Sequence, residues 1–143
     1  MHTDRDGRHV LVGVTGGIAA YKTAGLVSML VQQGHDVSVT MTPAATKFVG
    51  AATFEALSGR PVFLDSWTAI DDAASQHVSF AARADIMIVA PCSMNSLAKF
   101  AHGFASDALS LLVAAVDRSR VPVLLAPAMN AVMWSQPSTQ RNI

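Results

Sequence analysis

The sequence has little of what marks several large classes of protein. It has one cysteine, Cys92, so it cannot form an internal disulfide, which is consistent with a cytoplasmic protein. Lys and Arg together number 10, as do Asp and Glu, and they form no basic stripe, which argues against nucleic acid as a partner. No apolar run reaches the ~20 residues that span a membrane, and the polar residues 1–7 do not resemble a secretory signal.

Charge of either sign is also scarce. Charged residues make up 14% of the sequence and hydrophobic residues 51%. This balance is too apolar for a disordered chain and leaves few charges for the surface of a free monomer. A well-filled core of parallel strands would account for it, and so would an oligomer that covers apolar surface. The length of 143 residues predicts one domain.

Short apolar runs alternate with segments of helical spacing. Strands are predicted at residues 10–14, 37–41, 86–90 and 122–126, and the first and the last of them are predicted to be buried. Helices are predicted at residues 18–33, 44–57 and 95–116, the last with a break near Gly103, and a loop with short helical pieces at 62–79. This order predicts an α/β fold, a three-layer Rossmann-like or flavodoxin-like parallel sheet with helices on both faces.

The first predicted strand runs into a glycine turn in residues 13–22. Gly16 and Gly17 let the backbone approach a ligand closely, and the helix start at Ile18 and Ala19 offers N–H groups to a phosphate. The spacing fits neither Gly-x-Gly-x-x-Gly nor the P-loop. A single phosphate, as in a mononucleotide, suits this loop better, although a simple tight turn would have the same pattern.

Three further loops follow predicted strands. Thr42 follows the second strand and either contacts the same phosphate or simply caps a helix. Residues 91–96 follow the third strand, and residues 127–134, with the pattern Pro-x-Met-Asn-x-x-Met-Trp, follow the fourth. Because ligands of open α/β sheets bind outside the carboxyl ends of the strands, these loops predict a binding site.

The pattern at residues 127–134 resembles the signature of the flavin-dependent cysteine decarboxylases. That family includes phosphopantothenoylcysteine decarboxylases of coenzyme A biosynthesis and peptidyl-cysteine decarboxylases of lantibiotic maturation. Residues 13–22 resemble the first loop of the coenzyme A branch nearly letter for letter, and the likeness extends over residues 10–143. It implies an FMN cofactor, held by Gly16, Gly17, Ile18, Ala19, Thr42, Pro91, Ser93, Met94 and Asn95.

The resemblance also implies roles in catalysis. His77, followed by Val78, stands where the family has its catalytic histidine, and it would take or steer a substrate proton. Asn130 would hydrogen-bond the substrate carboxylate or amide, and Met129 would pack on the flavin ring. Of the other histidines, His2, His9 and His35 are expected to be exposed and His102 to be structural, and no Cys/His spacing indicates a metal.

The implied function is FMN-dependent decarboxylation of 4′-phospho-N-pantothenoylcysteine to 4′-phosphopantetheine by a homo-oligomer, a trimer or dodecamer. A peptidyl-cysteine decarboxylase would use the same site. A flavin prenyltransferase, which would share the fold, is a third alternative, because Cys92 and Met94 give the motif Pro-Cys-Ser-Met of that family. A non-enzymatic regulator with this fold is a fourth alternative; it would be expected to lack the catalytic histidine, and His77 is present. In the stretch after Gly103, Ser106 replaces an acidic residue that is usual in the family.

The number of predicted strands raises an expectation about domain boundaries. A doubly wound domain normally carries at least one strand more than the four predicted here. We therefore expect residues 1–143 to be a single flavin-binding decarboxylase domain that lacks its C-terminal strand and the substrate clamp of the family. Such a chain alone would bind flavin with little turnover.

Overall fold

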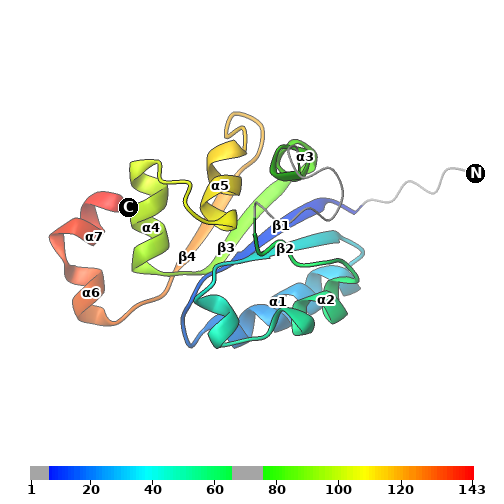
Figure 1. Cartoon of the computed structure of the whole chain (residues 1–143), viewed down its shortest axis with the longest axis horizontal. Helices are drawn as coiled ribbons and strands as arrows, with labels where there is room; N and C mark the ends of the chain where they lie inside the picture. Colours follow the sequence, from blue (N-terminus) through cyan, green and yellow to red (C-terminus); the bar gives the residue numbers. More distant parts are fainter. Residues whose placement is uncertain (1–6, 66–75) are drawn as a thin grey trace, which may run out of the picture.

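The computed structural model describes residues 7–65 and 76–143, which contain four strands in one parallel sheet of order β2-β1-β3-β4 (Figure 1). The strands are β1 (His9–Val14), β2 (Asp36–Met41), β3 (Ile86–Cys92) and β4 (Val123–Pro127). The helices are α1 (Ala20–Gln32), the short 3₁₀ turn η1 (Ala45–Lys47), α2 (Ala51–Ser58), α3 (Gln76–Arg83), α4 (Met94–His102), α5 (Ala108–Ala115), α6 (Ala131–Ser135) and α7 (Pro137–Asn142).

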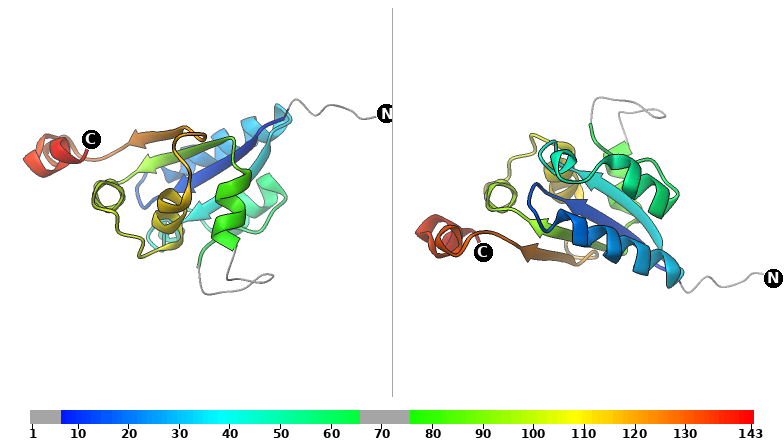
Figure 2. Two further views of the ribbon diagram at one scale, coloured as in Figure 1. Left: turned by 90° about the horizontal axis from the view of Figure 1, so that it is seen from above. Right: turned by 90° about the horizontal axis from the view of Figure 1, so that it is seen from below.

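Strand β1 shows how the apolar side chains divide between the two faces of the sheet, since successive residues of a strand point to opposite sides. Val10, Val12 and Val14 belong to a buried cluster with residues of α1 and α2, whereas Leu11 belongs to a second cluster with residues of α3, α4 and α5. The two helical layers lie on opposite sides of the sheet (Figure 2). The predicted three-layer α/β fold is therefore confirmed.

The strand order places a topological switch between β1 and β3. The chain passes from β1 to β2 on one side and later to β3 on the other, and both neighbours pair with β1 in parallel. Ligands of open α/β sheets bind at such a switch, outside the carboxyl ends of the strands.

Two predicted segments differ from the structure. The helix expected at 44–57 is divided, because Gly50 has an extended backbone with ψ 146° and α2 begins only after it. Part of the loop expected at 62–79 is regular: Phe63 pairs with β2 through its N–H, 2.9 Å from the carbonyl oxygen of Val39, and α3 begins at Gln76. Residues 66–75 of that segment lie outside the described residues.

Strand β4 is more exposed than its apolar sequence predicted. It pairs with β3 and forms one edge of the described sheet, and Leu124 is 53% exposed. Together with α6 and α7 it extends beyond the helical layers (Figure 2). The prediction of a buried fourth strand is therefore wrong within the described residues, because apolar sequence does not show whether neighbouring elements cover a strand.

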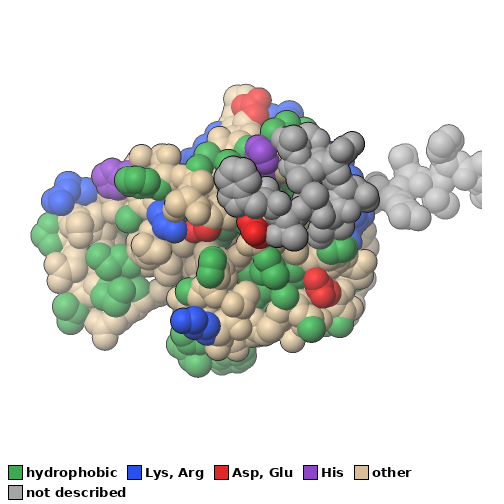
Figure 3. Space-filling model, in the orientation of Figure 1, with side chains coloured by type: hydrophobic (Ala, Val, Ile, Leu, Met, Phe, Trp, Pro, Cys, Tyr) green, Lys and Arg blue, Asp and Glu red, His purple; other side chains and the backbone are tan. Residues whose placement is uncertain are grey.

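The surface carries few charges and several large apolar side chains. On the face shown in Figure 3, charged side chains are scattered and hydrophobic ones reach the surface at several places. Ile18 is 78% exposed, Val132 67% and Phe104 62%. The low charge content thus reflects apolar surface as well as a filled core. Among the described residues, no helix is both long and apolar enough to cross a membrane.

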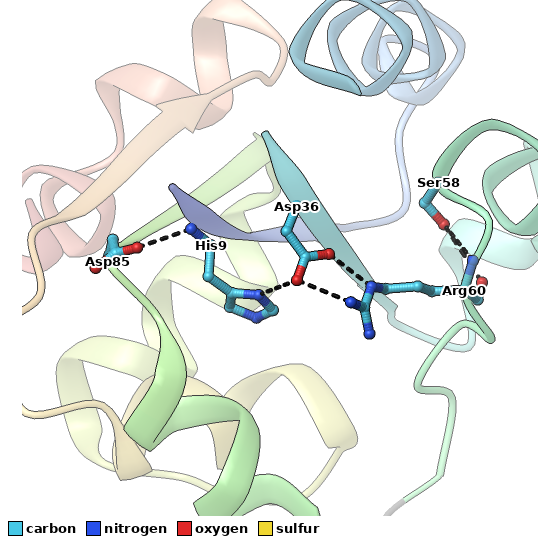
Figure 4. A network of polar contacts seen from close by, with 5 residues as sticks. All are labelled: His9, Asp36, Ser58, Arg60 and Asp85. Carbon is cyan, nitrogen blue, oxygen red and sulfur yellow. Dashed lines mark hydrogen bonds and ion pairs between the residues drawn. The ribbon is translucent and has the colours of Figure 1, made fainter. Parts of the chain in front are cut away.

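His9 is buried, against the expectation that it is exposed, and it belongs to the polar network shown in Figure 4. It is the first residue of β1, and its backbone N–H donates to Asp85 at 2.7 Å. Its Nδ1 lies 3.1 Å from a carboxylate oxygen of Asp36, which also accepts two hydrogen bonds from Arg60, at 2.6 and 2.8 Å. This network closes the amino ends of β1 and β2, at the opposite end of the strands from the predicted site.

Asp36→Asn is expected to lower the free energy of unfolding by about 1 kcal/mol or less at pH 7, because it weakens a half-exposed ion pair. Burial opposes ionisation of Asp36, but hydrogen bonds from His9 and Arg60 outweigh it and lower the pKa of this carboxyl. A carboxyl with a lowered pKa stabilises the fold above its unfolded pKa, and that contribution is lost as the pH falls.

The difference in unfolding free energy between wild type and Asp36→Asn should therefore have its largest value near neutral pH. It should shrink as the pH falls below the unfolded pKa of about 3.8. Urea unfolding at several pH values measures it. A difference that stays constant down to strongly acidic pH would contradict the assignment.

Candidate functional site

A cavity of about 470 Å³ lies at the carboxyl ends of the strands. The loops after β1, β2 and β3 all contribute to it, and α6 adds one side chain. Its lining comprises Gly16, Thr42, Pro43, Ala44, Ser93, Met94, Asn95, Ser96, Lys99, Asp107 and Met133. Five of the residues expected to bind a cofactor, Gly16, Thr42, Ser93, Met94 and Asn95, thus meet in one place.

Gly16 allows the first two loops to touch. A Cβ atom at this position would lie 2.5 Å from the Cβ of Ala44 and 3.1 Å from its carbonyl carbon, too close for any side chain. Thr42 begins the second loop, where its Oγ1 accepts a hydrogen bond from the N–H of Ala45 at 3.2 Å. Because the oxygen acts as acceptor, the hydroxyl hydrogen can donate to a ligand in the cavity.

Thr15 joins the first loop to the third across the switch point. Its side chain is fully buried, donates to the carbonyl of Pro91 at 2.6 Å and accepts from the N–H of Ser93 at 2.9 Å. The hydroxyl therefore fixes both loops against each other. Sequence reasoning gave Thr15 no role, although its place beside the glycine pair was a usable signal.

Helix α4 starts at the cavity wall. Ser93 is its N-cap and accepts a hydrogen bond from the N–H of Ser96 at 3.2 Å. The first turn, with Met94 and Asn95, therefore presents the positive end of the helix to the cavity. Farther along the helix, Lys99 pairs with Asp107, the N-cap of α5, at 2.7 Å. Sequence reasoning assigned no role to this ion pair.

Asn130 lies at the start of α6 and is exposed. Its Oδ1 accepts a hydrogen bond from the N–H of Val132 at 2.8 Å, which caps the helix. The amide NH₂ group remains able to donate to a ligand. The loop before it is tied to β3, since the N–H of Ala128 donates to the carbonyl of Cys92 at 3.1 Å.

The other predicted site residues lie outside this cavity's lining. Ala19 and Pro91 line a second, mostly apolar cavity of about 320 Å³ between α1 and the ends of β3 and β4. A Cβ atom on Gly17 would be 3.9 Å from Pro91, and Ile18 is exposed.

Two further predicted site residues, Met129 and His77, also lie outside the lining of the main cavity. Met129 is half-buried, whereas Met133, which sequence reasoning left without a role, lines the main cavity. His77 is half-buried in the first turn of α3 and lines neither of these cavities. Within the described residues, His77 thus lies apart from the lining of the main cavity.

Cys92 is buried at the end of β3, and burial raises the pKa of its thiol to about 12. A thiol with that pKa stays protonated at neutral pH and is a poor nucleophile. This agrees with a packing role for Cys92. Among the described residues, no group of three or more His, Cys, Asp or Glu side chains is arranged to hold a metal ion.

A parallel sheet with helices on both faces, and a cavity at its switch point, defines a doubly wound α/β protein, a class that binds its ligands at that point. The particular family follows from comparison with known proteins. The chain belongs to the Flavoprotein family, whose model matches residues 1–143. The family resemblance seen in the loop motifs is therefore confirmed.

Several known proteins are similar to this chain. The coenzyme A biosynthesis bifunctional protein CoaBC of Mycolicibacterium smegmatis is 45% identical over 136 residues, which are 95% of this chain and 32% of that protein. The chain thus spans about a third of the length of the curated relatives it matches.

Two solved structures have the same fold. The FMN-dependent cysteine decarboxylase SpaF is 34% identical with a TM-score of 0.84, over 96% of this chain and 77% of that one. A mutant PPC decarboxylase complexed with pantothenoylaminoethenethiol is 27% identical with a TM-score of 0.80, over 95% of this chain and 75% of that one.

Proposed function

We propose that this domain carries out the FMN-dependent decarboxylation of 4′-phospho-N-pantothenoylcysteine to 4′-phosphopantetheine in coenzyme A biosynthesis. The observation that carries the proposal is the meeting of three strand-end loops and Met133 of α6 around one cavity, with Asn130 as the N-cap of that helix. Similarity to CoaBC proteins and to an FMN-dependent cysteine decarboxylase supports it.

The cavity residues fit FMN. Gly16 brings the backbone of the first loop close to Ala44, where a phosphate would bind, and Thr42 supplies a hydroxyl from the second loop. Ser93, Met94 and Asn95 would hold the remainder of the cofactor along the first turn of α4. When bound, FMN would supply the two-electron oxidation that makes the cysteine carboxylate able to leave as carbon dioxide, and the reduction that then returns both electrons to the product.

The chain's own residues would orient the substrate and move its protons. The NH₂ group of Asn130 can donate to a carboxylate while the oxygen of the same amide caps α6. Met133 adds an apolar side chain to the lining of the cavity. His77 would act as the proton acceptor, reaching the site across a boundary between two copies of the chain.

One experiment tests the proposal. The natural full-length protein is purified, its visible spectrum recorded, and its cofactor extracted with acid. FMN should be recovered, and carbon dioxide should be released from 4′-phospho-N-pantothenoylcysteine. Recovery of FAD alone, or NAD binding without any flavin, would overturn the cofactor assignment; FMN without carbon dioxide release would overturn the reaction.

Gly16→Ala is expected to lower the affinity for FMN at least 100-fold. The new methyl group would overlap Ala44, so the first two loops must separate and lose their joint contact with the phosphate. Titration of the apoprotein with FMN, followed by flavin fluorescence, measures the change.

Gly25→Ala is the matched control. Gly25 lies in α1, and a Cβ atom there would meet nothing within 4 Å. This variant should bind FMN normally and be more stable by up to about 1 kcal/mol. Normal FMN binding by Gly16→Ala would show that the loop contact is dispensable.

A peptidyl-cysteine decarboxylase is the second candidate. The structural likeness to SpaF, with a TM-score of 0.84, slightly exceeds the likeness to the PPC decarboxylase, at 0.80. The two functions differ in substrate and not in the cavity described above. Competition between a C-terminal cysteine peptide and 4′-phospho-N-pantothenoylcysteine would decide between them, and we expect the small phosphorylated substrate to be preferred.

We also propose that the chain forms a cytoplasmic homo-oligomer of at least three copies. Exposed apolar side chains such as Ile18, Val132 and Trp134 support this proposal, because covering them would remove apolar surface from water. Light scattering of the flavin-bound protein at micromolar concentration should give the mass of a trimer or a multiple of it. A monomer mass would contradict the proposal.

A further inference from the structure

One ion pair lines the main cavity and has no role in the proposed reaction as described above. Lys99, on α4, and Asp107, before α5, are the charged side chains among the described residues that line it. Their side chains are 25% and 11% exposed, and Nζ lies 2.7 Å from the carboxylate. Removing two such charges from water costs free energy unless they are well hydrogen-bonded, so a pair on the wall of a ligand cavity is a candidate for a role in binding.

The side chain and backbone of Asp107 both have hydrogen-bond partners. Its carboxylate accepts from Lys99 and from the N–H of Ser110, at 2.7 Å each, and the Ser110 hydroxyl completes a capping box. Burial opposes ionisation of Asp107, but these hydrogen bonds outweigh it and lower its pKa. The carboxylate therefore stays charged and holds the Lys99 ammonium in one position on the cavity wall.

Lys99 retains donors for a ligand. An ammonium group has three N–H bonds, and Asp107 takes one of them. The positive end of α4, at Met94 and Asn95, lies on the same wall. The ammonium and the helix end both favour an anion at this wall, and the carboxylate of Asp107 offsets part of the charge of Lys99.

We propose that Lys99 makes this cavity bind reduced flavin more tightly than oxidised flavin. The inference rests on the proposed function. Oxidised flavin takes up two electrons and one proton to give a reduced form with one more negative charge on its ring at neutral pH. A fixed ammonium on the cavity wall stabilises that charge, and a positive charge near the ring is a known means of tuning a flavin. The chain would thereby promote the step in which the substrate gives up electrons.

The test measures the dissociation constants of oxidised FMN and of FMN reduced with dithionite, for wild type and three variants. Lys99→Met should lower the preference for reduced FMN at least tenfold, which corresponds to about 30 mV for a two-electron couple. Asp107→Asn should raise the preference several-fold, because Lys99 loses its counter-charge while Asn still caps α5. The double variant Lys99→Met with Asp107→Asn, which removes both charges, should fall between the two single variants.

The opposite changes in flavin preference expected for Lys99→Met and Asp107→Asn separate an electrostatic role of the pair from a structural one. A merely structural pair would weaken binding of both flavin forms in every variant, and the preference would not change. If Lys99 instead held the FMN phosphate, Lys99→Met would weaken both forms of FMN equally and leave riboflavin binding unchanged. Either result would overturn the inference while leaving the proposed function intact. A wild-type protein that binds no flavin would overturn both.

Discussion

Replacing His77 with Asn should lower kcat for decarboxylation at least 100-fold and leave FMN bound. A positioned proton acceptor contributes about 10²- to 10⁴-fold to a rate, and an asparagine amide cannot accept a proton at neutral pH. His77 is half-buried in the first turn of α3 and lines neither cavity of its own chain, so its loss should not empty the flavin site. Carbon dioxide release and the flavin spectrum measure the two properties separately.

His35→Asn is a suitable control for His77→Asn. His35 lies before β2, and its Nδ1 accepts a hydrogen bond from the N–H of Arg8 at 3.2 Å, at the amino ends of the strands. That variant should keep full activity. An unchanged rate in His77→Asn would remove His77 from the mechanism and return the regulator reading to consideration.

Mixing two inactive variants tests whether His77 acts across a subunit boundary. Chains with Gly16→Ala should lack FMN but keep His77, and chains with His77→Asn should keep FMN. Oligomers refolded from an equal mixture should recover part of the activity if His77 serves the flavin of a neighbouring copy. If His77 serves its own chain, the mixture should stay inactive.

The fold was predictable from the sequence because its main signals are local. The runs at β1 and β3 are apolar enough to mark buried strands, and Gly34 and Gly103 end helices with φ of 88° and 73°, as glycine readily does. The cavity residues Gly16, Thr42 and Ser93 were also predictable, since strand ends of a parallel sheet meet at one edge.

The features that the sequence did not predict depend on contacts between distant elements. His9 is held at the start of β1 by Asp36 and Asp85, and Arg60 in turn holds Asp36, so the contacts come from separate segments. The exposure of β4 depends on which elements cover it, which its own residues do not encode. Lys99 and Asp107 are eight positions apart, with the helix break at Gly103 between them, so helical periodicity does not predict their ion pair.

Asn130→Asp is expected to lower kcat/KM for decarboxylation about 100-fold. Asn130 occupies the loop in which the chain carries its most specific motif, and its side chain has two separate tasks. The oxygen caps α6 by accepting from the N–H of Val132 at 2.8 Å, and the NH₂ group can donate to the substrate carboxylate. An aspartate keeps the first task, since Asp is as good an N-cap as Asn, and removes the second.

The size of the effect follows from the charge of the substrate. Loss of a hydrogen bond to a charged group costs about 1.5–3 kcal/mol, and a second carboxylate facing the substrate adds repulsion. Because each 1.4 kcal/mol changes a rate constant tenfold, a loss of about 100-fold is the expected result. FMN affinity should be unchanged, since Asn130 does not line the main cavity with Gly16 and Thr42.

Asn130→Ser completes the test. Serine also caps a helix but is neutral and shorter, so it removes the amide donor without adding a charge. Its activity should fall between those of wild type and Asn130→Asp, and lowering the pH should partly restore Asn130→Asp as its carboxyl becomes protonated. Equal losses in both variants, independent of pH, would mean that Asn130 positions the loop and does not meet the substrate carboxylate.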